Sequence, residues 1–162
     1  MASAEEIVIS ALNSLDVPYD TIEIDPEFAD TAVFCEKYDW PPEKSANTII
    51  VASKKEPKKF VACVVLATTR LDVNKRVKKL MGVPRASFAT ADEMKQLTGM
   101  EVGGVTVFAL PEGLPLYVDA RVMACDWVIL GGGGRSKKIK ISPEIFGKLR
   151  AEVTPDLALE IS

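Results

Sequence analysis

Two glycine-rich turns are the residues of this chain with the clearest potential for chemistry. The first runs from Thr98 to Thr106 and contains Gly103 and Gly104, and the second is Gly131 to Gly134. Glycine lets the backbone approach a ligand closely and tolerates a positive φ. Two such turns in one small domain predict a pocket walled by main-chain N–H groups.

Arg135 directly follows the second turn. Because four consecutive glycines lose much backbone entropy on folding, the run predicts a function. The guanidinium fork of Arg135 suits a phosphate. The same arginine is also consistent with an ordinary surface position after a flexible turn. The spacing of a Walker phosphate-binding loop is absent.

The composition excludes several kinds of catalytic site. The chain contains no histidine, which removes histidine-based triads and the commonest metal ligand. The three cysteines, Cys35, Cys63 and Cys125, show no C-x-x-C spacing, and Cys63 lies in an apolar run typical of a buried, inert thiol. The carboxylates show no evident catalytic pairing. We therefore expect neither a metal ion nor a cofactor.

Length and charge indicate one globular domain spanning residues 1–162. The net charge of −3 argues against a protein held to nucleic acid by bulk charge, but it allows a local basic patch. A helix expected at 73–81 carries four basic residues, which form either a solvated face or an RNA-contact surface. No apolar run is long enough to span a bilayer, and the acidic N-terminus lacks a signal-peptide core. We expect a cytoplasmic protein without a membrane partner.

Helical and strand-like patterns alternate irregularly along the chain. Apolar spacing and capping residues predict helices at 5–15, at 32–38 with Thr31 as the cap, at 73–81 with Asp72 as the cap, between a capping box at Thr90 and Gly99, and after Ser142-Pro143. Strands are expected at 19–24, 47–53, 60–68, 105–110, 116–118, 127–130 and 138–141. This order is typical of an α+β domain with a curved, mostly antiparallel sheet.

The order of these motifs resembles a known family. The motifs are Thr31-Ala32, Asn47-Thr48-Ile49-Ile50-Val51, the turn from Thr98 to Val105, Tyr117-Val118-Asp119, Gly131 to Arg135, and Ile141-Ser142-Pro143. Together they resemble the YbaK/prolyl-tRNA-editing superfamily over residues 18–149. The resemblance implies a barrel-like antiparallel sheet flanked by helices. It also implies hydrolysis of the ester between a mischarged amino acid and the terminal adenosine of tRNA.

The resemblance assigns roles to the matching positions. Catalytic positions next to the ester would be Asn47, Thr48, Gly103 and Gly104. Substrate-binding positions would be Thr31, Thr106, Asp119, Gly131, Gly132, Gly133, Gly134 and Arg135. Ordinary strand threonines explain Thr48 and Thr106 equally well, a tight turn explains the glycine pair, and Asp119 is also consistent with a structural role. The partners would be the acceptor end of an aminoacyl-tRNA and an aminoacyl-tRNA synthetase.

Two positions depart from the family pattern. Asn47 occupies the place where members usually carry a lysine that orients the substrate, and asparagine bears no charge. Val107 occupies the place of a proline that borders the amino-acid pocket. The leading hypothesis is a free-standing trans-editing deacylase. The alternative is a protein of the same fold that binds aminoacyl-tRNA, a nucleotide or a protein partner without turnover.

Overall fold

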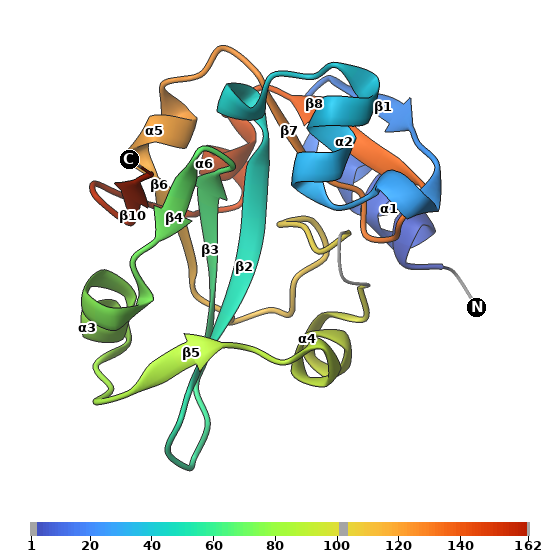
Figure 1. Ribbon diagram of the computed structural model, residues 1–162. Helices are drawn as coiled ribbons and strands as arrows, with labels where there is room; N and C mark the ends of the chain where they lie inside the picture. Colours follow the sequence, from blue (N-terminus) through green and yellow to red (C-terminus); the bar gives the residue numbers. More distant parts are fainter. Residues whose placement is uncertain (1–2, 101–103, 162) are drawn as a thin grey trace.

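The computed structural model describes residues 3–100 and 104–161, and these form an α+β domain with three sheets. The strand orders are β1-β8-β7, β5-β2-β3-β6-β9 and β10-β4. Figure 1 shows the three-stranded sheet on one side of the molecule and the five-stranded sheet in its centre. The expected α+β class is confirmed. Across the described ranges the sheets do not close into a barrel, so that part of the expectation is wrong.

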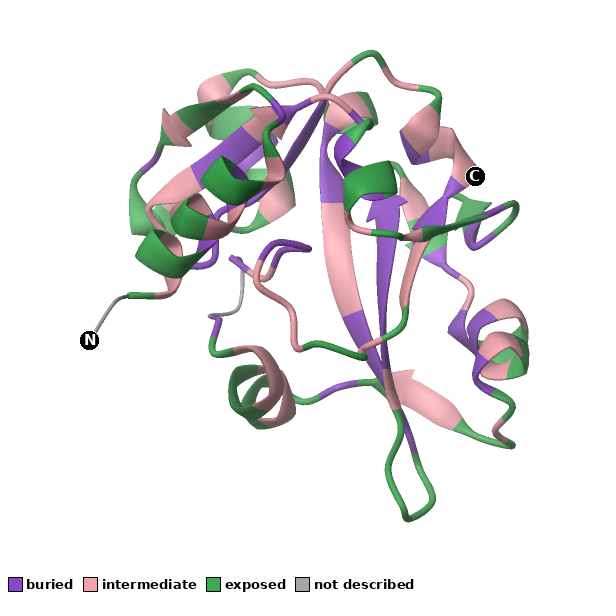
Figure 2. Ribbon diagram, turned by 180° about the vertical axis from the view of Figure 1, so that it is seen from behind, coloured by how far each residue is buried: buried purple, intermediate pink, exposed green. Residues whose placement is uncertain are grey.

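The three-stranded sheet lies between two helices. It consists of β1 (Tyr19–Glu23), β7 (Val128–Gly131) and β8 (Lys137–Ile141), with β8 in the middle and antiparallel to both neighbours. On one face, α1 (Ala4–Leu15) packs Val8 and Leu12 against the apolar side chains of β8. The face that α1 covers is seen in Figure 2. On the other face lies α2 (Thr31–Tyr38), with Phe34 and Cys35 buried.

The five-stranded sheet is built on a long hairpin. Strands β2 (Ala46–Ser53) and β3 (Phe60–Leu66) are antiparallel, and β5 (Ala86–Phe88) extends the sheet beside β2. On the other side, β6 (Leu116–Asp119) runs parallel to β3, and β9 (Glu152–Thr154) runs parallel to β6. Five of the seven strand pairings in the described chain are antiparallel, as expected.

Short elements cover the two faces of the five-stranded sheet. One face packs against η3 (Val73–Val77), α3 (Lys78–Met81) and the pair β4 (Thr69–Leu71) and β10 (Ala158–Glu160), with Cys63 and Leu157 fully buried. The other face meets α4 (Ala91–Thr98) and the segment 105–114. The remaining short helices are η1 (Pro26–Phe28), η2 (Pro42–Lys44), α5 (Ala120–Met123) and α6 (Ile145–Lys148).

Several local signals are confirmed at atomic level. Thr90 and Glu93 form a reciprocal capping box at the start of α4, and Gly99 ends that helix with a φ of 73°. The Asp72 carboxylate accepts a hydrogen bond from the Lys75 backbone N–H at 3.2 Å, as a cap should. The helix expected at 73–81 is nevertheless divided, because its first turn has π geometry and only 78–81 is α-helical.

Three local predictions are wrong. Residues 105–110 form no strand; Val107 and Phe108 are buried in the core, and Ala109 has a φ of 66° that turns the chain. Thr31 is the first residue of α2 rather than its cap, because Asp30 occupies the N-cap position. The last main helix begins at Ile145, later than Ser142-Pro143 predicted. No helix among the described residues has the length and apolar character needed to cross a bilayer.

Candidate functional site

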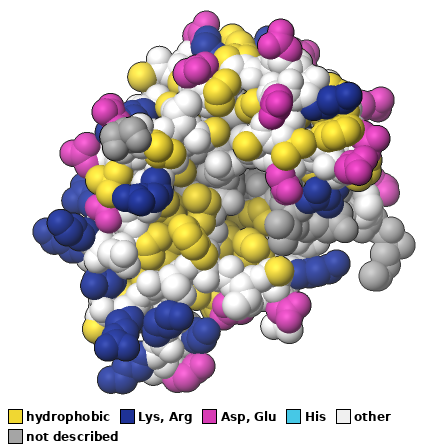
Figure 3. Space-filling view, in the orientation of Figure 1, with side chains coloured by type: hydrophobic (Ala, Val, Ile, Leu, Met, Phe, Trp, Pro, Cys, Tyr) yellow, Lys and Arg dark blue, Asp and Glu magenta, His cyan; other side chains and the backbone are white. Residues whose placement is uncertain are grey.

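A cavity of about 490 Å³ opens where the two large sheets meet, between α2, β2 and β7. We call it the α2–β2 cavity. Its lining residues come from the start of α2, from β2, from the segment around α4 and from β7 and β8: Asp30, Thr31, Ala32, Phe34, Ser45, Ala46, Asn47, Thr48, Ile49, Ile50, Phe88, Ala89, Met94, Val105, Ile129, Leu130, Gly131 and Lys138. Figure 3 shows hydrophobic side chains across the middle of one molecular face, bordered by charged groups. The size and largely apolar lining of the α2–β2 cavity suit a small organic group.

A hydrogen bond between α2 and β2 organises one wall of the cavity. The Thr31 hydroxyl donates to Asn47 Oδ1 over 2.5 Å. This bond explains why Thr31 is not a helix cap, since its side chain turns to the sheet. The bond also orients the Asn47 amide, with the acceptor Oδ1 toward Thr31 and the donor group Nδ2 at the other end.

The two predicted threonines have hydroxyl groups without a hydrogen-bond partner in the described part of the chain. Thr48 is a lining residue of the cavity, and its Oγ1 atom is buried. Thr106 is fully buried and is not among the described lining residues. A buried hydroxyl without a partner costs free energy, and Thr48 is the one of the pair that lies at the cavity.

Lys138 brings a charge to the cavity. It lies on β8 opposite Gly131 of β7 and is only 4% exposed, and its Nζ lies 5.4 Å from the centre of the Phe34 ring. Burial lowers the pKa of Lys138 to about 8, and the positive charge of Arg135 acts in the same direction. The charges of Asp30 and Cys35 oppose this shift. Desolvation dominates because it disfavours the protonated amine.

Arg135 contacts the loop before α2. Its Nε donates to the Pro26 carbonyl oxygen at 3.1 Å, and its Nη1 lies 3.4 Å from Asp30 Oδ1. These contacts connect the end of the second glycine turn to the residue that precedes α2. A contact between Arg135 and a phosphate stays a prediction.

The glycines have a packing role that the sequence did not indicate. A Cβ on Gly104 would lie 2.0 Å from the Gly134 carbonyl oxygen, and a Cβ on Gly131 would lie 2.7 Å from that of Val105. The two turns therefore pack backbone against backbone. The Gly133 N–H donates to the Gly104 carbonyl oxygen at 2.7 Å.

The rest of the glycine run packs against neighbouring protein. A Cβ on Gly132 would meet the Lys137 carbonyl oxygen, one on Gly133 would meet Val8, and one on Gly134 would meet Glu5. Of the glycines predicted at the site, Gly131 lines the cavity, whereas Gly104, Gly132, Gly133 and Gly134 are not among its described lining residues. Gly103 lies outside the described residues.

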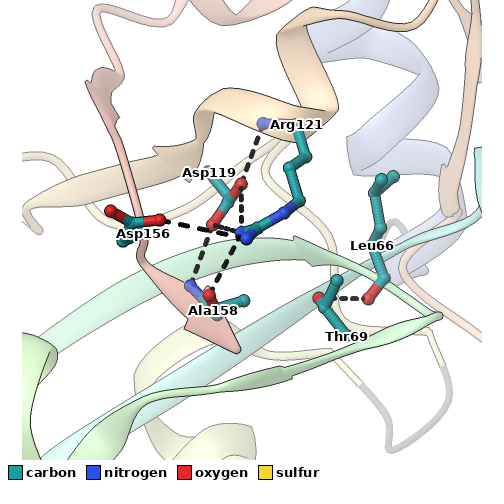
Figure 4. A network of polar contacts seen from close by, with 6 residues as sticks. All are labelled: Leu66, Thr69, Asp119, Arg121, Asp156 and Ala158. Atoms are coloured by element: carbon teal, nitrogen blue, oxygen red, sulfur yellow. Dashed lines mark hydrogen bonds and ion pairs between the residues drawn. The ribbon is translucent and has the colours of Figure 1, made fainter. Parts of the chain in front are cut away.

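Asp119 is a buried structural residue (Figure 4). Its carboxylate accepts hydrogen bonds from the Arg121 and Ala158 backbone N–H groups, both at 2.8 Å, and pairs with the Arg121 guanidinium at 3.2 Å. Asp119 thereby connects β6, α5 and β10. It does not belong to the described cavity lining, and a role of Asp119 in substrate binding stays a prediction.

The site as a whole combines apolar walls with a few polar groups. Thr31, Asn47, Thr48, Gly131 and Lys138 share one cavity. Such a set can hold a small apolar group and present hydrogen-bond donors and one positive charge to its polar end. Within 3–100 and 104–161, no group of three or more histidine, cysteine or acidic residues is arranged to hold a metal ion.

Sequence reasoning missed Lys138 and Phe34. The pattern of β8 places Ile139 and Ile141 on the face toward α1, so Lys138 on the opposite face resembles a solvent-exposed lysine. Only the packing of α2 on that face buries it.

Comparison with known proteins agrees with this architecture. A model of the aminoacyl-tRNA editing domain family matches residues 25–149. The chain is similar to the crystal structure of a candidate trans-editing enzyme for prolyl tRNA synthetase, with a TM-score of 0.82, 20% identity and coverage of 100% of this chain and 99% of the other. It is also similar to hypothetical protein APE2540, with a TM-score of 0.83, 27% identity and coverage of 94% and 99%. The first likeness, at this identity, concerns the fold alone.

Proposed function

Because the chain belongs to the aminoacyl-tRNA editing domain family, we propose that it hydrolyses the ester of a mischarged aminoacyl-tRNA as a free-standing trans-editing protein. The observation that carries this proposal is the α2–β2 cavity, in which Thr31, Asn47 and Thr48 gather beside apolar walls. The apolar walls suit the side chain of a small amino acid. The polar residues suit its ester and the terminal ribose.

The reaction needs positioning and charge stabilisation more than a strong base. Water adds to the ester carbonyl carbon, and negative charge develops on the carbonyl oxygen before the ribose oxygen leaves. The Asn47 Nδ2 group is suited to donate to this oxygen, since Thr31 fixes the other end of the amide. The resemblance implies that a hydroxyl of the terminal ribose assists the attack. A chain without histidine is compatible with this route.

One observation favours the alternative, a protein that binds aminoacyl-tRNA, a nucleotide or a protein partner without turnover. Asn47 stands where the family pattern has a lysine, and its Oδ1 is engaged by Thr31. An uncharged amide stabilises a developing negative charge less than an ammonium group does. The two functions differ in turnover, and they share the cavity and the acceptor end as ligand.

A deacylation screen tests the proposal. The purified protein is incubated with tRNAs charged with alanine, cysteine, serine, threonine or proline, and release of the free amino acid is followed. Turnover of one or more of these substrates is expected, and the preferred one identifies the amino acid. A synthetase added in a parallel series tests the proposed partner. Binding of charged tRNA without release would support the alternative.

A further inference from the structure

We propose that a basic surface beside the α2–β2 cavity binds the phosphates of the tRNA acceptor end and sets the direction in which the RNA strand leaves the cavity. This inference rests on the proposed function and deepens it. We call this region the basic surface, and it comprises the turn of the β2–β3 hairpin, the residue before β5, and η3 with α3: Lys54, Lys55, Lys58, Lys59, Lys75, Arg76, Lys78, Lys79 and Arg85.

The first argument is the segregation of charge along the chain. Residues 54–85 hold ten of the 20 lysines and arginines but two of the 23 aspartates and glutamates. Their net charge is therefore +8, whereas the remaining residues together carry −11. A chain with a net charge of −3 thus keeps one strongly positive region, and such a region attracts a polyanion despite the overall sign.

The fold brings the two basic segments to one side of the molecule. Val77 of η3 and Ala86 of β5 belong to the same apolar cluster, so η3 lies beside β5. The Lys54 backbone N–H donates to the Arg85 carbonyl oxygen at 3.1 Å, which connects the hairpin turn to the start of β5. Figure 3 shows the basic side chains at the edge of the molecular face whose middle is hydrophobic, over α3 and over the β2–β3 hairpin.

Few acidic groups of the protein neutralise this surface. Within the described ranges, its one ion pair joins Lys58 Nζ to Glu93 Oε2 at 2.9 Å. Glu56 lies in the hairpin turn, and Asp72 caps η3. Most of the basic side chains are exposed: Lys54, Lys55, Lys58, Lys59, Lys75, Lys79 and Arg85. Because like charges gathered in this way repel one another, an anionic ligand that bridges them is favoured.

Two neighbouring strands connect the cavity to the basic surface. Ile50 of β2 and Phe88 of β5 line the cavity, and further along the same strands Ser53 lies opposite Ala86. Arg85 precedes Phe88 by three residues, which is about 10 Å along an extended strand. An RNA strand whose 3′ end occupies the cavity can therefore reach the basic surface with the phosphates that precede its terminal nucleotide.

The other side of the cavity disfavours an RNA strand. Residues 20–43, which include α2, contain eight aspartates and glutamates and one lysine. Asp30 of this segment lines the cavity, and its side chain is 62% exposed. Phosphates that passed over α2 would meet charges of their own sign, whereas phosphates that passed over β5 would meet lysines and arginines. The distribution of charge across the cavity therefore favours one direction for the strand.

The apolar residues near the basic surface favour RNA over an anionic lipid surface. Phe88 is 58% exposed and lies between the cavity and Arg85, where an aromatic ring can stack on an unpaired base. Val77 of η3 and Met81 of α3 are buried in the core. These side chains are consequently not available for insertion into a bilayer, as an amphipathic membrane-binding helix would require.

Two double variants and a matched control test the proposal. They are Lys54→Gln/Lys55→Gln in the hairpin turn, Lys75→Gln/Lys79→Gln in η3 and α3, and, as the control with the same change of charge, Lys37→Gln/Lys148→Gln in α2 and α6. All six side chains are exposed, so each variant is expected to fold, and circular dichroism verifies this. The affinity for uncharged tRNA is measured between about 50 and 200 mM salt. The kcat and KM for deacylation of charged tRNA and the binding to phosphatidylserine vesicles are measured in parallel.

The basic-surface variants should bind uncharged tRNA about tenfold more weakly at about 100 mM salt. The slope of log affinity against log salt should decrease by about one for each phosphate contact that is lost. For deacylation KM should rise and kcat should stay the same, because the substituted residues are remote from the ester. The control variant should resemble the wild type. A loss beyond that of the control in either variant supports the proposal and locates the contacts.

Two results would overturn the inference. One is that both basic-surface variants bind tRNA with the affinity and salt slope of the control. The other is that they lose binding to the vesicles while their affinity for tRNA is unchanged, which would assign the basic surface to a lipid.

The two readouts separate this inference from the proposed function. If the wild-type protein hydrolyses charged tRNA and the basic-surface variants keep its affinity for tRNA, the inference fails and the function stands. If the wild-type protein binds tRNA through the basic surface but releases no amino acid from any charged tRNA, the proposed hydrolysis fails and the inference stands. If the wild-type protein neither binds nor hydrolyses charged tRNA, both fail.

Discussion

Replacement of Lys138 by methionine should stabilise the protein in a pH-dependent manner. Methionine has a similar length and no charge, so the variant removes the cost of burying an ammonium group that is only 4% exposed. Burial lowers the pKa of Lys138 from its ordinary 10.5 to about 8. One pKa unit corresponds to about 1.4 kcal/mol, so below pH 8 the cost is about 3 kcal/mol.

The sign follows from proton binding in the two states. Between about pH 8 and 10.5 the unfolded chain keeps the Lys138 proton and the folded chain does not. The free energy of unfolding of the wild-type protein therefore rises with pH in this window. The Lys138→Met protein lacks this contribution, so its advantage should be greatest near neutral pH and should shrink by about 2 kcal/mol between about pH 7 and 9.5.

Urea unfolding of both proteins at these two pH values measures the effect. The comparison uses the difference between the proteins, since all other titrating groups are shared and cancel. Lys140→Met, a change on the same face of β8, serves as the control and should show a much smaller change with pH. A difference between wild type and Lys138→Met that is the same at both pH values would refute the argument that the Lys138 ammonium is buried at a cost.

Three further perturbations test the packing of the fold. Gly104→Ala should destabilise the protein by at least about 3 kcal/mol in chemical denaturation, because the new Cβ would lie 2.0 Å from the Gly134 carbonyl oxygen. Gly147→Ala is the control: the space around its Cβ is open, so this variant should be neutral or stabilising. Asp119→Ala should cost about 3 kcal/mol in the same assay, since it leaves the buried Ala158 N–H group without its acceptor and removes one carboxylate partner of the Arg121 guanidinium. A loss under about 1 kcal/mol would contradict this. In the native protein, Cys63 should react with a thiol reagent far more slowly than the half-buried Cys125, because burial raises the Cys63 pKa to about 12. Equal reaction rates of the two thiols would refute this prediction.

Longer elements with their own capping and periodicity were predictable from the sequence. The helix at 5–15, the Thr90 capping box and the strands at 47–53 and 116–118 all correspond to observed elements. The strands β4, β5, β9 and β10 have three residues each, which is too short for an alternating pattern to be recognised. The segment 105–110 looked like a strand because it is apolar, but burial in the core satisfies that pattern equally well.

The residues of the candidate site that lie in local sequence motifs were predictable from the sequence. Thr31, Asn47 and Thr48 were singled out from the sequence, and the structure brings them to one cavity. The glycine run was interpreted as a ligand wall, whereas most of it packs against α1 and the segment at Gly104. Lys138 could not be identified, because its environment depends on Phe34 of α2, which lies beside it and comes from a distant part of the chain. Contacts of this kind follow from tertiary packing and leave no local pattern.

Multiple-turnover deacylation tests the central claim most directly. Wild-type protein is mixed with a large excess of charged tRNA, and free amino acid is counted per protein molecule over time. The account predicts steady release well beyond one amino acid per protein, at a rate that falls in Asn47→Ala but not in Lys140→Met. Tight binding of charged tRNA with no release above the spontaneous rate would contradict the claim and identify the chain as a binding protein.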